Sequence, residues 1–136
     1  MKKPLKPEVD FRAWIKKAES DFKTAEHILT LKESCPFDTV CFHAQQCVEK
    51  YLKALLVSRS LDFPKTHDLR LLMQKIPAEI NLKLHIEEVV SLNRYTIEAR
   101  YPGDWEPFNR KEADKAVRIA RMVRKAVKAY LPAEME

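Results

Sequence analysis

Glycine is almost absent from this chain. Its 136 residues include one glycine, Gly103. Tight β-hairpin turns favour glycine because they need positive φ angles, so a hairpin-rich β fold is disfavoured. Glycine-rich phosphate loops and dinucleotide-binding fingerprints need several glycines, and both are excluded. Any bound nucleotide must therefore be held by side chains or by helix ends.

Cysteine is also scarce, and long apolar runs are missing. The three cysteines, Cys35, Cys41 and Cys47, are odd in number and lack the spacing of a zinc site. This pattern indicates reduced thiols in a cytoplasmic protein. No segment has the length of a membrane span, and the basic N-terminus lacks the apolar stretch of a signal peptide. We expect no membrane association, no metal and no cofactor.

Charge is plentiful and slightly unbalanced. Lysine and arginine number 25 and acidic residues 20, for a net charge of +5. The excess gathers in segment 110–128, where Arg118, Arg121, Lys125 and Lys128 recur at intervals of three and four. Two interpretations remain open for this ridge: a solvated helix face, or a surface for RNA or an acidic partner.

Apolar periodicity predicts an all-α fold. Apolar residues recur at intervals of three and four in segments of about 11–32, 38–59, 78–99 and from 109 onwards, and a short helix is expected at about 67–75. Asp10 and Asn109 are candidate N-caps. Because the connections are short, we expect a single domain spanning 1–136. Its architecture would be an antiparallel up-down bundle of four long helices plus one short helix.

The segment FHAQQCVEKYLKALL, residues 42–56, has two distinct sides. One side is an apolar stripe, while Phe42, Gln46 and Lys53 fall on the opposite side of the predicted helix. An aromatic residue on the back of a core helix indicates a second contact. We therefore expect Phe42, Gln46 and Lys53 to form a homodimer contact.

The same helix carries His43, Cys47 and Lys50 in one row beside the apolar stripe. His43 and Cys47 are too few to hold a metal, and a helix interior is a poor place for a cysteine nucleophile. His67 is either a structural histidine or a site residue near the opening that His43 reaches.

Arg94, Arg100 and Tyr101 form the second group of interest, at the end of the predicted fourth helix. Paired guanidinium groups beside aromatic rings suit phosphate and base recognition. The alternative is that these arginines complement the helix dipole and form surface ion pairs. The candidate ligand-binding residues are Arg94, Arg100, Tyr101, His67, His43 and Lys50.

Four phrases together resemble the HEPN domain family: WIKKAESDFKTA, FHAQQCVEKYLKALL, THDLRLL and ARYPGDW. The resemblance covers nearly the whole chain. It implies a bundle of four or five helices, often dimeric and frequently paired with a separate nucleotidyltransferase in toxin–antitoxin-like arrangements. Many members are metal-independent RNases with an R-x(4–6)-H motif. Here no histidine follows Arg94, and Arg100 and Tyr101 stand in that region.

Three functional hypotheses follow. The first is a non-catalytic module that binds nucleotide or RNA, with no assigned catalytic residue and a nucleotidyltransferase as its partner. The second is an endoribonuclease in which Arg94 and Arg100 stabilise the phosphate and His43 or His67 carries the proton. The third is a protein whose only role is subunit contact.

Overall fold

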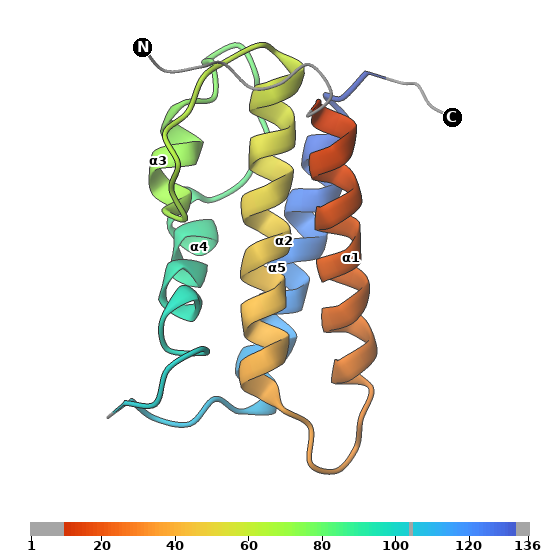
Figure 1. Cartoon of the computed structure of the whole chain (residues 1–136), viewed down its shortest axis with the longest axis vertical. Coiled ribbons are helices and arrows are strands. Elements are labelled where there is room, and N and C mark those ends of the chain that lie inside the picture. The colour runs from red at the N-terminus through yellow and green to blue at the C-terminus, as the bar shows by residue number, and fades with distance from the viewer. Residues whose placement is uncertain (1–9, 104, 133–136) are drawn as a thin grey trace.

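The computed structural model describes residues 10–103 and 105–132. In these ranges every regular element is a helix (Figure 1), which confirms the all-α fold class. Three long helices form the body: α1 (Phe11–Leu29), α2 (Phe37–Ser58) and α5 (Arg110–Lys128). The short elements α3 (Leu69–Gln74), α4 (Ile86–Val90) and the 3-10 helix η1 (Ser91–Thr96) line the other side of α2.

Capping residues set the starts of two long helices as expected. The Asp10 side chain accepts a hydrogen bond from the backbone amide of Arg12, and Asn109 accepts one from the amide of Glu112. Pro36 precedes α2 and separates it from α1. These local signals place the three long helices within a few residues of their predicted bounds.

The fourth long helix expected over Ala78–Ala99 is wrong in its length. Asn81 accepts a hydrogen bond from the amide of Lys83 at 2.9 Å, and Lys83 takes a left-handed φ of 57°, so the chain turns before Ile86. Asn93 then ties η1 to α3 by accepting from the amide of Leu69 at 2.9 Å. The result is three long helices with short helical elements in place of a fourth.

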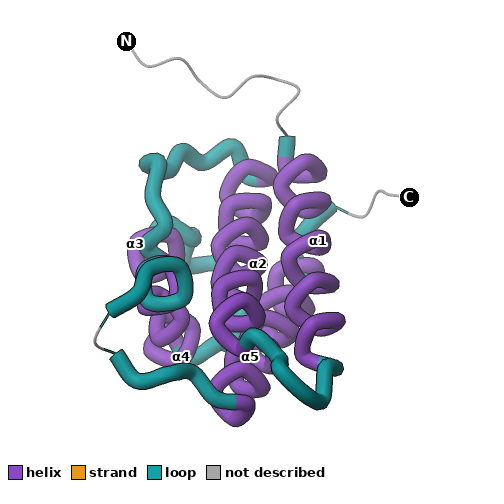
Figure 2. Tube along the Cα trace, turned by 60° about the horizontal axis from the view of Figure 1, so that its bottom comes forward, coloured by secondary structure: helices purple, strands orange, loops and turns teal. Residues whose placement is uncertain are grey.

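Helix α2 is the centre of the molecule. Figure 2 shows it between α1 on one side and α3 and α4 on the other, with α5 also packed against it. Its second half, from Tyr51 to Leu56, is buried all round, and Ala44 and Val48 on its predicted apolar stripe are fully buried. Trp14, which belongs to the apolar periodicity of α1, is only half-buried. A helix enclosed in this way leaves little of its surface for ligands except near its first turns.

Candidate functional site

Arg100 lies against two aromatic rings at the end of the bundle where α2 begins. Its guanidinium carbon is 5.5 Å from the centre of the Phe42 ring and 5.6 Å from that of Tyr101. Phe42 in turn meets the His43 ring edge-on, with centroids 5.5 Å apart. Arg100 and Tyr101 are exposed. The structure therefore brings Arg100, Tyr101 and His43 together around Phe42, which sequence reasoning had placed only at a subunit contact.

Arg100 retains hydrogen-bonding capacity in this position. Among the residues that the structure describes, no carboxylate pairs with it, and its planar group is positioned by aromatic contacts. A guanidinium held in this way can present its N–H donors to phosphate oxygens. The neighbouring rings offer surfaces on which a base can stack.

His43 is oriented by a buried carboxylate from α1. Its Nδ1 lies 2.8 Å from Asp21 Oδ1, and Lys50 Nζ donates to the other Asp21 oxygen at 2.7 Å. Burial alone would raise the pKa of Asp21, but the bonds and charges of His43 and Lys50 outweigh it and hold that pKa below its usual value. Because Nδ1 is engaged, Nε2 is the ring nitrogen left to meet a ligand. Lys50 serves mainly to complete this ion-paired group.

Arg94 belongs to a separate arrangement. Its Nη1 donates to Glu112 at 2.6 Å and its Nη2 to Glu98 at 2.8 Å, while the guanidinium carbon lies 5.1 Å from the centre of the Phe108 ring. The hydrogen bond with Glu98 raises the pKa of Arg94 further. These contacts join η1 to the first turn of α5. The ion-pair alternative therefore describes Arg94, and the phosphate hypothesis now rests on Arg100.

His67 lies in a third group, around a buried carboxylate on α2. Its Nδ1 is 2.9 Å from Glu49 Oε1, and Lys53 Nζ donates to Glu49 Oε2 at 2.9 Å. The His67 side chain is 63% exposed, whereas that of Glu49 is 3% exposed. No contact among the described residues links this group to Arg100. The geometry makes His67 a tether for its loop.

Lys53 was expected at a homodimer contact on the back of α2, but it is buried. Only 5% of it is exposed, because Glu49 neutralises its charge and the rings of Trp14 and Phe63 cover it at 5.3 and 5.8 Å. It therefore cannot lie on an exposed subunit surface. Phe42 and Gln46 are half-buried, and their dimer contact stays a prediction.

Cys47 is poorly placed to act as a nucleophile. Cys47 is fully buried, and burial raises the pKa of its thiol, while His43 is committed to Asp21. The alternative of a Cys47 nucleophile is therefore wrong. No group of three or more potential metal ligands occurs within 10–103 and 105–132. In the same ranges no helix is both long enough and apolar enough to cross a membrane.

Sequence reasoning missed two buried acids, Asp21 and Glu49. A signal existed for Asp21, because it falls beside Ala18, Phe22 and Ala25 on the apolar stripe of its helix. A charged residue on such a stripe usually has a buried partner. For Glu49 the signal is weaker: the following YLKALL run indicates a helix buried all round.

The arrangement defines a class of protein: an all-helical domain with an arginine–aromatic surface and a carboxylate-oriented histidine. The HEPN domain family model matches residues 11–130, and the chain belongs to that family. The crystal structure of TT1696 from Thermus thermophilus is similar, with a TM-score of 0.76 and 27% identity over 89% of this chain and 98% of that one.

One further solved structure and one further protein are similar to this chain. The crystal structure of ST0689, an archaeal HEPN homologue, has a TM-score of 0.69 and 25% identity, covering 88% of this chain and 96% of that one. A protein of Methanocaldococcus jannaschii named "Putative toxin MJ1304" is 27% identical, over 88% of this chain and 87% of that protein.

Proposed function

We propose that this protein is the HEPN component of a toxin–antitoxin-type pair and that it binds RNA or nucleotide phosphate through Arg100. The observation that carries the binding proposal is the exposed Arg100 guanidinium, 5.5 Å from the Phe42 ring centre and next to Tyr101. Arginine donates to phosphate bidentately, and aromatic rings stack on bases without regard to sequence. His43 would contribute its Nε2 as a third polar contact.

The toxin–antitoxin assignment rests on family membership and sequence similarity. The chain belongs to the HEPN domain family, and a relative matched over most of both chains bears a toxin name. The proposed partner is a minimal nucleotidyltransferase, as the resemblance to paired HEPN proteins implies. Co-expression of this chain with such a protein encoded beside it, followed by co-purification, tests the partner. Failure to form a complex would contradict this part of the proposal and leave RNA binding untouched.

The binding experiment uses a short fluorescent RNA and compares Arg100→Ala with the unmodified protein. Losing a charged hydrogen bond costs about 1.5–3 kcal/mol, which corresponds to roughly a 10- to 100-fold weaker Kd. Arg121→Ala is the matched control, because Arg121 is an exposed arginine paired with Glu26 on another part of the bundle. Equal affinity of Arg100→Ala and the unmodified protein would refute Arg100 as the binding residue.

A second candidate function, RNA cleavage, is favoured by the Asp21–His43 pair near Arg100. His43 Nε2 would accept the proton of a ribose 2′-hydroxyl; the 2′-oxygen would attack phosphorus, and the departing 5′-oxygen would take a proton from water. The products would carry 2′,3′-cyclic phosphate ends and would form in EDTA. We rank this second, because no histidine completes the R-x(4–6)-H pattern. Cleavage in EDTA that His43→Ala abolishes would reverse the ranking.

A further inference from the structure

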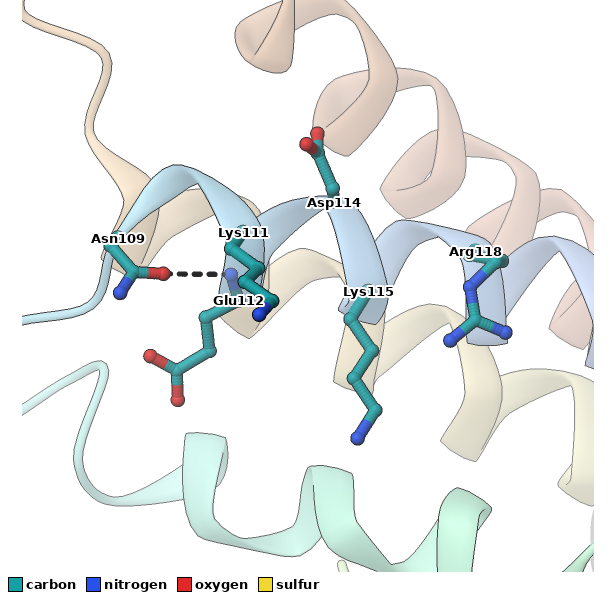
Figure 3. Close-up of a pocket in the computed structure, with 6 residues that line it drawn as sticks. All are labelled: Asn109, Lys111, Glu112, Asp114, Lys115 and Arg118. Atoms are coloured by element: carbon teal, nitrogen blue, oxygen red, sulfur yellow. Dashed lines mark hydrogen bonds between the residues drawn. The ribbon is translucent and has the colours of Figure 1, made fainter.

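A shallow groove of about 550 Å³ lies along the first half of α5. The six residues that line it are all of polar or charged type: Asn109, Lys111, Glu112, Asp114, Lys115 and Arg118. Figure 3 shows Lys115 and Arg118 pointing to the same side of α5, towards the neighbouring short helices, while Asp114 points away from them. Lys111, Lys115 and Arg118 are spaced by four and three residues, which places them on one helix face.

The two acidic residues of the groove, Glu112 and Asp114, do not cancel its three basic residues, and Asp114 points to the other side of α5 (Figure 3). Glu112 Oε2 accepts from Arg94 Nη1 at 2.6 Å and from the Tyr95 hydroxyl at 3.0 Å, so this carboxylate already has two donors. Arg118 reaches Glu88 only at 3.5 Å. Within the described ranges, Lys111 and Lys115 are exposed and make no ion pair. The groove therefore keeps a net positive charge that points into solvent.

In the second half of α5, by contrast, most basic side chains are paired with carboxylates. Arg121 pairs with Glu26 at 2.8 Å, Arg124 with Glu19 at 2.6 Å, and Lys128 approaches the same Glu19 carboxylate at 3.5 Å. Of the basic ridge expected from sequence, Arg118, Arg121 and Lys128 each lie within 3.5 Å of a carboxylate, whereas Lys125 is exposed and makes no ion pair with the described residues. Two neighbouring lysines that also make no ion pair with those residues lie one to two turns before Arg118, at Lys111 and Lys115.

We propose that this groove binds the sugar–phosphate backbone of single-stranded RNA, as an extension of the Arg100 site; this rests on the proposed function. Lys111 and Lys115 are about 6 Å apart along the helix axis, a separation that lets each reach a different phosphate of one strand. The cores of protein–protein interfaces are poor in lysine and rich in aromatic residues, and this lining has no apolar residue. RNA therefore fits the groove better than an acidic protein.

The two sites lie at the same end of the bundle. Arg94 joins η1 to Glu112 in the groove, and Arg100 lies four residues after the end of η1. Figure 1 shows the first turns of α2, the segment after η1 and the start of α5 at one end of the molecule. A strand held by Arg100 could therefore continue along α5.

The test is the salt dependence of RNA binding by the double variant Lys111→Gln/Lys115→Gln. Each phosphate contact in a single strand contributes about 0.7 to the slope of log K against log salt, so losing two contacts lowers the slope by about 1.4. Affinity for a ten-nucleotide RNA should fall about tenfold at low salt, while affinity for a mononucleotide at the Arg100 site stays unchanged. The matched control is Lys16→Gln/Lys17→Gln, two exposed lysines on α1 that should leave the slope nearly unaltered.

The results of this experiment distinguish RNA binding in the α5 groove from ligand binding at Arg100. An unchanged slope in the α5 variant overturns the groove, and so does an unmodified protein that binds no RNA. Equal or tighter binding of a polyglutamate peptide, lost in the same variant, also overturns it and points to an acidic protein. If Arg100→Ala has no effect while the lysine variant lowers the slope, the groove stands and the Arg100 site fails. Thermal unfolding of both lysine variants, which replace exposed side chains, checks that the fold is intact.

Discussion

Arg94 and Arg100 illustrate how differently two similar residues can be used. Arg94 is held between Glu98 and Glu112 and lies over the rings of Tyr95 and Phe108. Arg100 has aromatic neighbours and is exposed to solvent. We infer that Arg94 stabilises the fold and that Arg100 is available for ligands.

This difference predicts that replacing Arg94 destabilises the protein more than replacing Arg100. Arg94→Ala should lower the free energy of unfolding by about 1–2 kcal/mol, because it leaves the half-buried Glu112 with fewer donors and removes a packed guanidinium. Arg100→Ala should change it by less than about 0.5 kcal/mol, since its side chain is exposed. Urea denaturation followed by circular dichroism measures both values. A reversed order would contradict the roles assigned here.

Cysteine reactivity is a second prediction at this scale. Burial raises the pKa of Cys41 to about 12 and also raises that of Cys47, whereas Cys35 is half-buried. Only the thiolate reacts with alkylating agents, so native protein at pH 8 should be modified first at Cys35 and not at Cys41 or Cys47. Peptide mass spectrometry after iodoacetamide treatment identifies the sites. In urea all three should react; modification of Cys47 in the native state would show that the core opens there.

Glu19 makes stability depend on pH. Burial raises the pKa of Glu19, but hydrogen bonds from Arg124 and Tyr51 outweigh it and lower the pKa from 4.5 to about 2. A depressed carboxyl pKa adds stability above the unfolded value, near pH 4.5, and this contribution disappears as the pH falls towards 2. The unfolding free energy of Glu19→Gln should therefore fall less steeply than that of the unmodified protein over this window. Parallel curves would contradict the assignment.

At the scale of secondary-structure elements, α5 holds the connection between α1 and α2. Arg110, its first residue, donates to the carbonyl oxygens of Leu29 at 2.9 Å and Leu31 at 2.6 Å, and its guanidinium lies over the Phe37 ring. One side chain thus satisfies carbonyl groups at the end of α1 and contacts the start of α2. The connection is therefore held in place by hydrogen bonds from a residue about 80 positions later in the chain.

Removing this contact should destabilise the protein measurably. Arg110→Ala should cost about 1–2 kcal/mol of unfolding free energy, because two carbonyl groups lose a charged donor. Arg110→Lys should recover only part, since an ammonium group lacks the planar fork that reaches both oxygens. Lys111→Ala, the exposed neighbour, serves as the control and should have little effect in the same thermal unfolding experiment. Equal Tm values for all three variants would refute the role of Arg110.

At the scale of the whole molecule, apolar side chains remain exposed at the end of the bundle that carries Arg100. Ile97 is 59% exposed and Tyr101 54% exposed, and half-buried Phe42 lies under Arg100. Exposed apolar groups gathered in one region are typical of a contact surface. With Lys53 excluded, the predicted homodimer contact is reduced to Phe42 and Gln46.

The dimer prediction has a direct test. Phe42→Glu should shift the protein from dimer to monomer in sedimentation velocity experiments, because a carboxylate would have to be desolvated in the contact. Leu31→Glu is the control, since Leu31 is also exposed, at 46%, but lies in the connection after α1. Finding that the unmodified protein is a monomer at high micromolar concentration would end the dimer hypothesis.

The sequence alone determined the all-α class, the three long helices and the family. Periodic apolar residues, the caps Asp10 and Asn109 and the break at Pro36 act over a few residues, so they can be recognised without knowing what lies nearby. The motif phrases likewise carried the resemblance that the family match confirmed.

Only the tertiary structure decided how the charged residues are paired. Lys53 donates to Glu49, Arg94 donates to Glu112, and His43 bonds to Asp21. The last two pairs join residues at least 18 positions apart in the chain, so their pairing could not be predicted from local sequence. The fourth helix was shortened first by a local turn at Asn81 and Lys83, and Asn93 then bonds to Leu69 across the fold. Helix propensity and capping are local, whereas the partner of a charged side chain depends on which elements pack together. This is why Arg94, but not Arg100, is paired with carboxylates within the described part of the chain.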